Sequence, residues 1–184
     1  MKFDIPLNTD ETDGSHVEIF KSWRSFSDVF EGAKRMRVVT YCDSPEFILD
    51  LFEDLENLER LEVVVGDVDD YRERLIDKPD LADRLEQLRR DDKLVIYLCE
   101  NKEVHSKLYL IEYPDEDQTD EEAGDDQMTL GGEATTESDP RVEVSAAPAK
   151  VVIGSPNLSR NAWSNQTNVG VVYDTTIESN LYAR

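Results

Sequence analysis

The sequence predicts an α/β fold, in which a mixed, largely parallel sheet is flanked by helices on both faces. Three short runs, 37–42, 61–66 and 93–99, are apolar and rich in β-branched residues. Between them, apolar residues recur at helical spacing over 45–58 and 69–92. Buried strands that alternate with amphipathic helices are typical of parallel strands covered by helices.

Each of the two long helical segments contains one informative proline. After the first strand, Ser44 is expected as the N-cap, Pro45 at the first helical position and Glu46 near the positive end of the helix dipole. The second segment, 69–92, is expected to break near Pro79, because proline interrupts a continuous helix.

The remaining elements are shorter. Ser25 or Ser27 is expected to cap a helix that runs to about Lys34. A fourth strand, 104–113, follows the third after only a few residues, so we expect these two strands to pair antiparallel. After it, the sequence predicts strands over 149–153 and 168–173 and a short helix over 158–163.

The chain has 184 residues, which predicts a single domain over 1–184, and its formal net charge is −22. Such an excess of acid normally argues against a nucleic-acid partner. However, acidic residues are spread over the whole chain, and eight lysines stand against twelve arginines. This pattern suits a protein that works in concentrated salt, where charges are screened. Halophilic adaptation is the favoured interpretation, and an ordinary acidic protein with an acidic loop is the alternative.

One segment, 114–140, differs sharply in composition. Between Asp115 and Asp139 there are eleven acidic residues and no lysine or arginine. Such a segment buries too little apolar surface to offset its ordering entropy, so we predict a disordered acidic insertion. A solvated loop is the favoured interpretation. If the segment instead competes with a phosphate backbone, its deletion is expected to raise turnover in low salt.

Several classes of protein are excluded by the sequence. No apolar run is long enough to span a membrane, and the N-terminus has no apolar signal-peptide core. Cys42 and Cys99 are too few for a disulfide framework or a cysteine-rich metal site, and both are expected as buried free thiols. We therefore expect a cytoplasmic location, no metal and no cofactor.

Two sequence elements carry candidate chemistry. His105 and Lys107 stand two residues apart in the fourth predicted strand, so both point to one face. Gly154, Ser155 and Asn157 lie between a strand and a helix, where glycine allows a close backbone approach and the two polar residues can cap the helix. The free N–H groups of a helix start favour an anion such as phosphate. Each element alone also has an ordinary structural interpretation.

Taken together, the two elements resemble the HKD motif of the phospholipase D superfamily. That motif is His-x-Lys, four residues, Asp, and then, after a loop, Gly-Ser-x-Asn. The motif aspartate is replaced here by Glu112, and the family often has a glutamate at the place of Asn168. The upstream alternation of strands and helices also resembles the half-domain of this superfamily. The matching residues are His105, Lys107, Gly154, Ser155 and Asn157.

The resemblance implies metal-independent cleavage of a phosphodiester. His105 would attack phosphorus and form a phosphohistidine. Lys107 and Asn157 would hold the phosphoryl oxygens. A second histidine must act as general acid, and the only other one, His16, lies in no motif. Because superfamily enzymes use two motifs in each site, a homodimer or a second HKD-bearing domain is implied. If the second motif lies in another domain, this chain would form the N-terminal module of a longer protein. Gly154, Ser155 and Glu112 would support the site.

The implied substrate is nucleic acid, with DNA first, because single-motif members of the superfamily are mostly nucleases. A second interpretation is a catalytically weakened docking or dimerisation module of a larger DNA-repair, helicase or defence protein, which Asn168 favours. A lipid or small-phosphodiester hydrolase is third, and the sequence has no amphipathic anchor that would indicate a membrane partner. Trp23, Trp163 and Arg160 are candidates for lining a nucleic-acid groove, although a core role is favoured for Trp163.

Overall fold

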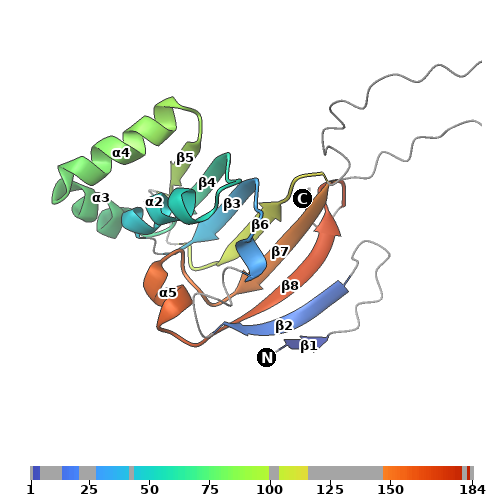
Figure 1. Ribbon diagram of the computed structural model, residues 1–184. Coiled ribbons are helices and arrows are strands. Elements are labelled where there is room, and N and C mark those ends of the chain that lie inside the picture. Colours follow the sequence, from blue (N-terminus) through green and yellow to red (C-terminus); the bar gives the residue numbers. More distant parts are fainter. Residues whose placement is uncertain are drawn as a thin grey trace, which may run out of the picture.

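In the computed structural model, the described residues are 2–4, 14–20, 28–41, 44–99, 104–115, 147–179 and 182. They form one eight-stranded sheet, with the strand order β1-β2-β8-β7-β6-β3-β4-β5 (Figure 1). The strands are β1 (Lys2–Asp4), β2 (Gly14–Phe20), β3 (Arg35–Thr40), β4 (Arg60–Val65), β5 (Leu94–Leu98), β6 (Leu108–Glu112), β7 (Pro148–Gly154) and β8 (Asn168–Thr176).

The sheet is mixed, as predicted, but it contains more antiparallel than parallel strand pairs. Only β3–β4 and β4–β5 pair in parallel, and the other five neighbouring pairs are antiparallel. The expectation of a largely parallel sheet therefore holds only for β3, β4 and β5. In that part, each strand is followed by a helical crossover, which parallel neighbours require.

The predicted pairing of the third and fourth strands is wrong. Among the described strands, β5 pairs with β4 alone, whereas β6 lies between β3 and β7. This placement sets Tyr109 opposite Val38 and Ile111 opposite Met36, so four side chains extend one buried face. The burial gained there, not the short connection, determines the partner of β6.

β1 and β2 were not predicted as strands. β2 pairs antiparallel with β8 from Gly14–Asp174 to Phe20–Asn168. Of the helix expected from Ser25 or Ser27 to Lys34, the structure describes a helical turn at 28–30, and 21–27 lie outside the described residues. Most of the predicted acidic insertion, 116–140, also lies outside them, as does Cys42.

Four helices are described, and two begin at the predicted prolines. The helices are α2 (Pro45–Asp54), α3 (Val68–Ile76), α4 (Pro79–Arg90) and α5 (Arg160–Ser164). Ser44 is the N-cap residue of α2, but its side chain accepts no hydrogen bond from a backbone N–H of the helix. Its hydroxyl donates instead to the Glu46 carboxylate at 2.9 Å. The break at Pro79 between α3 and α4 is confirmed.

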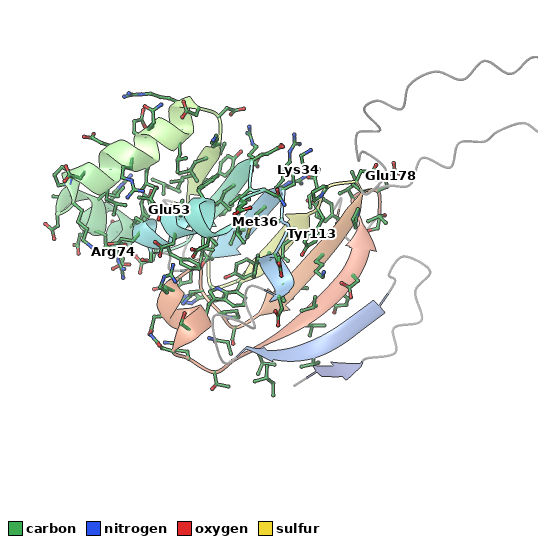
Figure 2. All side chains as sticks on the ribbon, viewed as in Figure 1. Lys34, Met36, Glu53, Arg74, Tyr113 and Glu178 are labelled. Carbon is green, nitrogen blue, oxygen red and sulfur yellow. The ribbon has the colours of Figure 1, made fainter. Side chains whose placement is uncertain are left out.

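The main core lies on one face of the sheet, and all four helices contribute to it. Phe47 of α2, Tyr71 of α3, Leu85 of α4 and Trp163 of α5 belong to the same cluster of buried residues. Figure 1 shows α2, α3 and α4 grouped beside the β3–β5 part of the sheet. Met36 of β3, labelled in Figure 2, is 1% exposed and belongs to this core.

The opposite face of the sheet differs from the prediction. Its cluster consists of Ala149, Val151 and Tyr182, with half-buried strand residues and Ile177 packed around them. Within the described part of the chain, no helix from α2 to α5 contributes to this cluster, so helices on both faces are not observed. Right-handed crossovers explain this result, because β3, β4 and β5 are added in one direction and their helices fall on the same side.

Two smaller expectations concern thiols and membranes. Cys99 is a free thiol that follows β5, but it is half-buried and not fully buried. Among the helices of the described residues, none has the length and apolar character needed to cross a membrane.

Candidate active site at the end of the sheet

The two halves of the motif lie at the same end of the sheet. His105 and Lys107 belong to an irregular stretch, 104–107, that directly precedes β6, so the predicted strand begins later than expected. Leu108, the first residue of β6, pairs with Val39 near the end of β3 and with Ile153 near the end of β7. The motif residues therefore stand beside the carboxyl ends of β3 and β7.

A backbone hydrogen bond joins the two halves directly. The Gly154 N–H donates to the Lys107 carbonyl at 3.2 Å. Gly154 also lies against β8: a Cβ at this position would stand 2.6 Å from the Val169 carbonyl oxygen and 2.8 Å from the Gly170 Cα. Only glycine fits such a close approach of two backbones without a shift of the chain.

His105 and Lys107 share one aromatic neighbour, Tyr41, which the sequence analysis did not single out. The His105 ring is stacked on the Tyr41 ring, with centroids 4.1 Å apart and planes 12° from parallel. The Lys107 ammonium lies 5.7 Å from the Tyr41 centroid and donates to the His105 carbonyl at 2.7 Å. The only sequence signal for Tyr41 is its place directly after β3, at the carboxyl edge of a parallel strand.

Ser155 is tied to the start of β8. Its hydroxyl donates to the Asn168 side-chain oxygen at 2.8 Å and accepts from the Val169 N–H at 3.1 Å. Asn168 is buried, and its amide donates to the Ala162 carbonyl in α5 at 2.6 Å. Asn168 therefore links the Gly154-Ser155 turn to α5.

The turn that follows β7 is also held by Tyr109 of β6. This buried phenol donates to the Pro156 carbonyl at 2.8 Å. Burial raises the pKa of Tyr109 far above its usual value, so the phenol stays a neutral donor. The turn that carries Asn157 is thereby anchored to β6.

Asn157 presents a buried acceptor. Its Oδ1 atom is buried and has no hydrogen-bond partner among the residues that the structure describes. Buried acceptors of this kind are rare in folded proteins and call for an explanation. The N–H donors of the same amide are on its other branch, and donors are what a phosphoryl oxygen requires.

The helix after the turn does not have the expected cap. α5 has five residues, and Ser159, not Ser155 or Asn157, accepts from the Ala162 N–H at 3.3 Å. The Leu158 N–H donates to the Thr40 hydroxyl at 3.1 Å. The expected row of free N–H groups is therefore partly occupied.

Glu112 lies apart from the other candidates. It ends β6, where it pairs with Arg35 and Ala149. Five strand residues at about 3.3 Å each place it roughly 16 Å from Lys107. Glu112 therefore stands at the opposite end of the sheet from His105.

The other candidate residues are distributed as follows. Trp163 is fully buried and packs edge-to-face on Tyr109 and Phe30, which confirms the core interpretation. Arg160 pairs with Asp50 at 2.9 Å and with Asp54 at 3.1 Å, both in α2. The backbone of His16 lies opposite Val172, and Trp23 is outside the described residues.

Comparison with models of protein families gives no match, and comparison with curated proteins gives none. Solved structures do show similarity. A yeast tyrosyl-DNA phosphodiesterase has a TM-score of 0.49 and 16% identity, over 86% of this chain and 31% of the other. Nuc from Salmonella typhimurium, described as a phospholipase D family member, has a TM-score of 0.46 and 12% identity, over 88% of this chain and 84% of the other. NucT from Helicobacter pylori has a TM-score of 0.44 and 13% identity, over 87% of this chain and 86% of the other.

This chain spans about a third of the length of the yeast enzyme or less. At 12–16% identity, the similarity concerns the fold.

Proposed function

We propose that this chain is a metal-independent phosphodiesterase, most specifically a nuclease or DNA-processing module. The observation that carries the proposal is the hydrogen bond between Gly154 and Lys107, which joins His-x-Lys to Gly-Ser-x-Asn at one end of the sheet. The two elements are separated by almost fifty residues in the sequence, and their contact in the fold supports the proposal. No metal has a role in the proposed reaction.

In the proposed first step, a nitrogen lone pair of His105 attacks phosphorus, and the bond from phosphorus to the leaving oxygen breaks. A second imidazolium gives its proton to that oxygen. In the second step, water attacks the phosphohistidine, the same second histidine takes the proton of water, and the phosphorus–nitrogen bond breaks. Lys107 and the Asn157 amide stabilise the negative charge on the phosphoryl oxygens in both steps.

The second histidine is proposed to come from a second copy of this chain, or from a second HKD-bearing domain. Two observations support an additional partner. The described part of the site holds one histidine, and Ile153 and Val169, beside Gly154 and Asn168, are 48% and 47% exposed. Exposed apolar side chains beside an incomplete site suit a protein interface. A cytoplasmic location remains part of the proposal.

The test is a cleavage assay in excess EDTA, with single- and double-stranded DNA, RNA and a soluble chromogenic phosphodiester. Salt is varied from low to molar KCl. We expect cleavage that His105→Ala abolishes and that His16→Ala, the matched control, leaves intact. A folded wild-type chain without cleavage under any of these conditions would contradict the enzyme proposal.

The alternative is a docking or dimerisation module without catalysis. The observation that favours it is Asn168, because this residue is committed to Ser155 and Ala162 and offers no carboxylate to orient a histidine. Sedimentation equilibrium separates the cases in part. A stable dimer that binds DNA without cutting it would support the alternative.

A further inference from the structure

The stretch of chain that directly precedes β6 carries the proposed nucleophile. The stretch 104–107 has no regular secondary structure, and His105 is exposed. A histidine that attacks phosphorus must point an in-plane nitrogen lone pair along one line, and small misalignments are costly in rate. Some contact outside the backbone must therefore fix the plane of the His105 ring.

Tyr41 makes that contact. Its ring covers one face of the imidazole, with centroids 4.1 Å apart and planes at 12°. Such a stacked pair restricts the ring to one plane and leaves its edge, where both nitrogens lie, uncovered by Tyr41. The same aromatic ring lies 5.7 Å from the Lys107 ammonium, within the range of a cation–π interaction.

Tyr41 is itself well held, so it can act as a platform. It follows directly on β3, in which Thr40 is fully buried. The Tyr41 carbonyl accepts from the Asp67 N–H at 2.7 Å, and the Thr40 carbonyl accepts from the Gly66 N–H at 2.9 Å. A Cβ on Gly66 would collide with the Val104 backbone, so the stretch that carries His105 passes closely over the end of β4.

We propose that Tyr41 is a positioning residue, which fixes the plane of His105 by stacking and holds Lys107 beside it. This inference rests on the proposed function for its effect on rate, but the ordering of His105 can be measured without catalysis. The aromatic face, not the phenolic hydroxyl, does the work. Phenylalanine should therefore replace Tyr41, whereas a side chain without a ring should not.

The experiment compares Tyr41→Leu and Tyr41→Gln with Tyr41→Phe. Tyr97→Leu is the matched control, because Tyr97 is a 51% exposed tyrosine on β5. Two properties are measured: the NMR resonance of the His105 ring carbon-bound protons, and kcat and KM for a chromogenic phosphodiester. The chain has two histidines, so a spectrum of His105→Gln assigns the resonance.

We expect the wild-type His105 resonance to be shifted upfield by the tyrosine ring current. The shift should remain in Tyr41→Phe and Tyr97→Leu and be lost in Tyr41→Leu and Tyr41→Gln. In the last two variants kcat should fall about 10- to 100-fold, because orientation is lost, while KM changes less than about threefold.

Two results would overturn the inference. One is a His105 resonance that does not differ between wild type and folded Tyr41→Leu or Tyr41→Gln. The other is an active wild-type enzyme whose kcat survives both substitutions. A wild type that cleaves nothing contradicts the proposed function instead, and the resonance alone then decides whether Tyr41 orders His105.

Discussion

At the scale of single residues, the site depends on short polar contacts that exclude most substitutions. Ser155 and Asn168 form one unit, since the Ser155 hydroxyl bonds to the Asn168 side chain and to the Val169 backbone. The Asn168 amide reaches on to Ala162 in α5. Any variant that removes one member leaves a buried polar group without its partner, and this costs more than the bond itself stabilises.

We expect Asn168→Ala to lower the free energy of unfolding by about 1–3 kcal/mol, because the buried Ala162 carbonyl and the Ser155 hydroxyl lose their partner. Chemical denaturation measures the change. Ser155→Ala and the double variant complete a mutant cycle, and a coupling energy of at least about 0.5 kcal/mol is expected. Strict additivity of the two single changes would contradict a shared network.

Gly154→Ala should be more harmful than its size suggests. The new Cβ would lie 2.6 Å from the Val169 carbonyl oxygen and 2.8 Å from the Gly170 Cα, and both are backbone atoms that cannot rotate away. Overpacking of this kind costs about 1–3 kcal/mol. Ile153→Val, at the neighbouring exposed position, is the control and should change thermal stability little. Equal melting temperatures for the two variants would refute the close approach.

The residues show where sequence reasoning succeeds and where it stops. The Gly-Ser-x-Asn turn was recognised because its residues are contiguous and glycine, serine and asparagine have restricted local roles. Tyr41 was not, because its importance comes from stacking on His105, 64 positions along the chain. Nothing in the local pattern around Tyr41 records that contact.

At the scale of elements, local signals predicted the order of β3, α2, β4, α3, α4 and β5. Pro45 and Pro79 stand at the first positions of α2 and α4. Proline favours this position whatever the rest of the fold, so these helix starts can be predicted from the local sequence. The partner of β6 is a different matter, since it depends on burial of Tyr109 and Ile111 against Val38 and Met36. Sequence proximity favoured β5, and burial outweighed it.

The contact between α2 and α4 allows a prediction about acid stability. Lys78, at the start of α4, hydrogen-bonds and pairs with Glu46 in the first turn of α2, and this bond holds the pKa of Glu46 below its usual 4.5. Between the lowered pKa of the folded state and the usual pKa of the unfolded state, the unfolded state therefore binds more protons than the native state. Glu46 therefore stabilises the fold above its unfolded pKa, and this contribution is lost as the pH falls through the folded pKa.

We expect Glu46→Gln to flatten this part of the acid unfolding curve below pH 4.5, with an effect of at most about 1 kcal/mol at neutral pH because the pair is exposed. Denaturant midpoints at pH 7 and pH 3 measure it. Glu53→Gln is a suitable control, since the pair of Glu53 with Arg84 also joins α2 to α4 and its removal leaves Lys78 and Glu46 untouched. An identical pH dependence of wild type and Glu46→Gln would count against the role of Lys78.

At the scale of the whole molecule, a net charge of −22 opposes compaction at low salt. Eleven ion pairs between described side chains offset part of this repulsion, but most of them are exposed and each stabilises by no more than about 1 kcal/mol. Screening by solvent ions is the remaining way to relieve the repulsion. At about 0.1 M salt the Debye length is still near 10 Å, whereas at 1 M it is about 3 Å.

The halophilic interpretation therefore predicts that raising KCl from about 0.1 M to 2 M increases the free energy of unfolding by at least about 1 kcal/mol, a large share of marginal stability. Urea midpoints at each salt concentration measure the change. The triple variant Glu56→Gln, Glu73→Gln, Asp83→Asn removes three exposed carboxylates and should depend less on salt. Sucrose is the control for effects other than charge screening, because it stabilises folded proteins by being excluded from their surface and does not screen charges. If stability is the same at both KCl concentrations, the charge belongs to an ordinary acidic protein, and the low-salt cleavage assay becomes the decisive one.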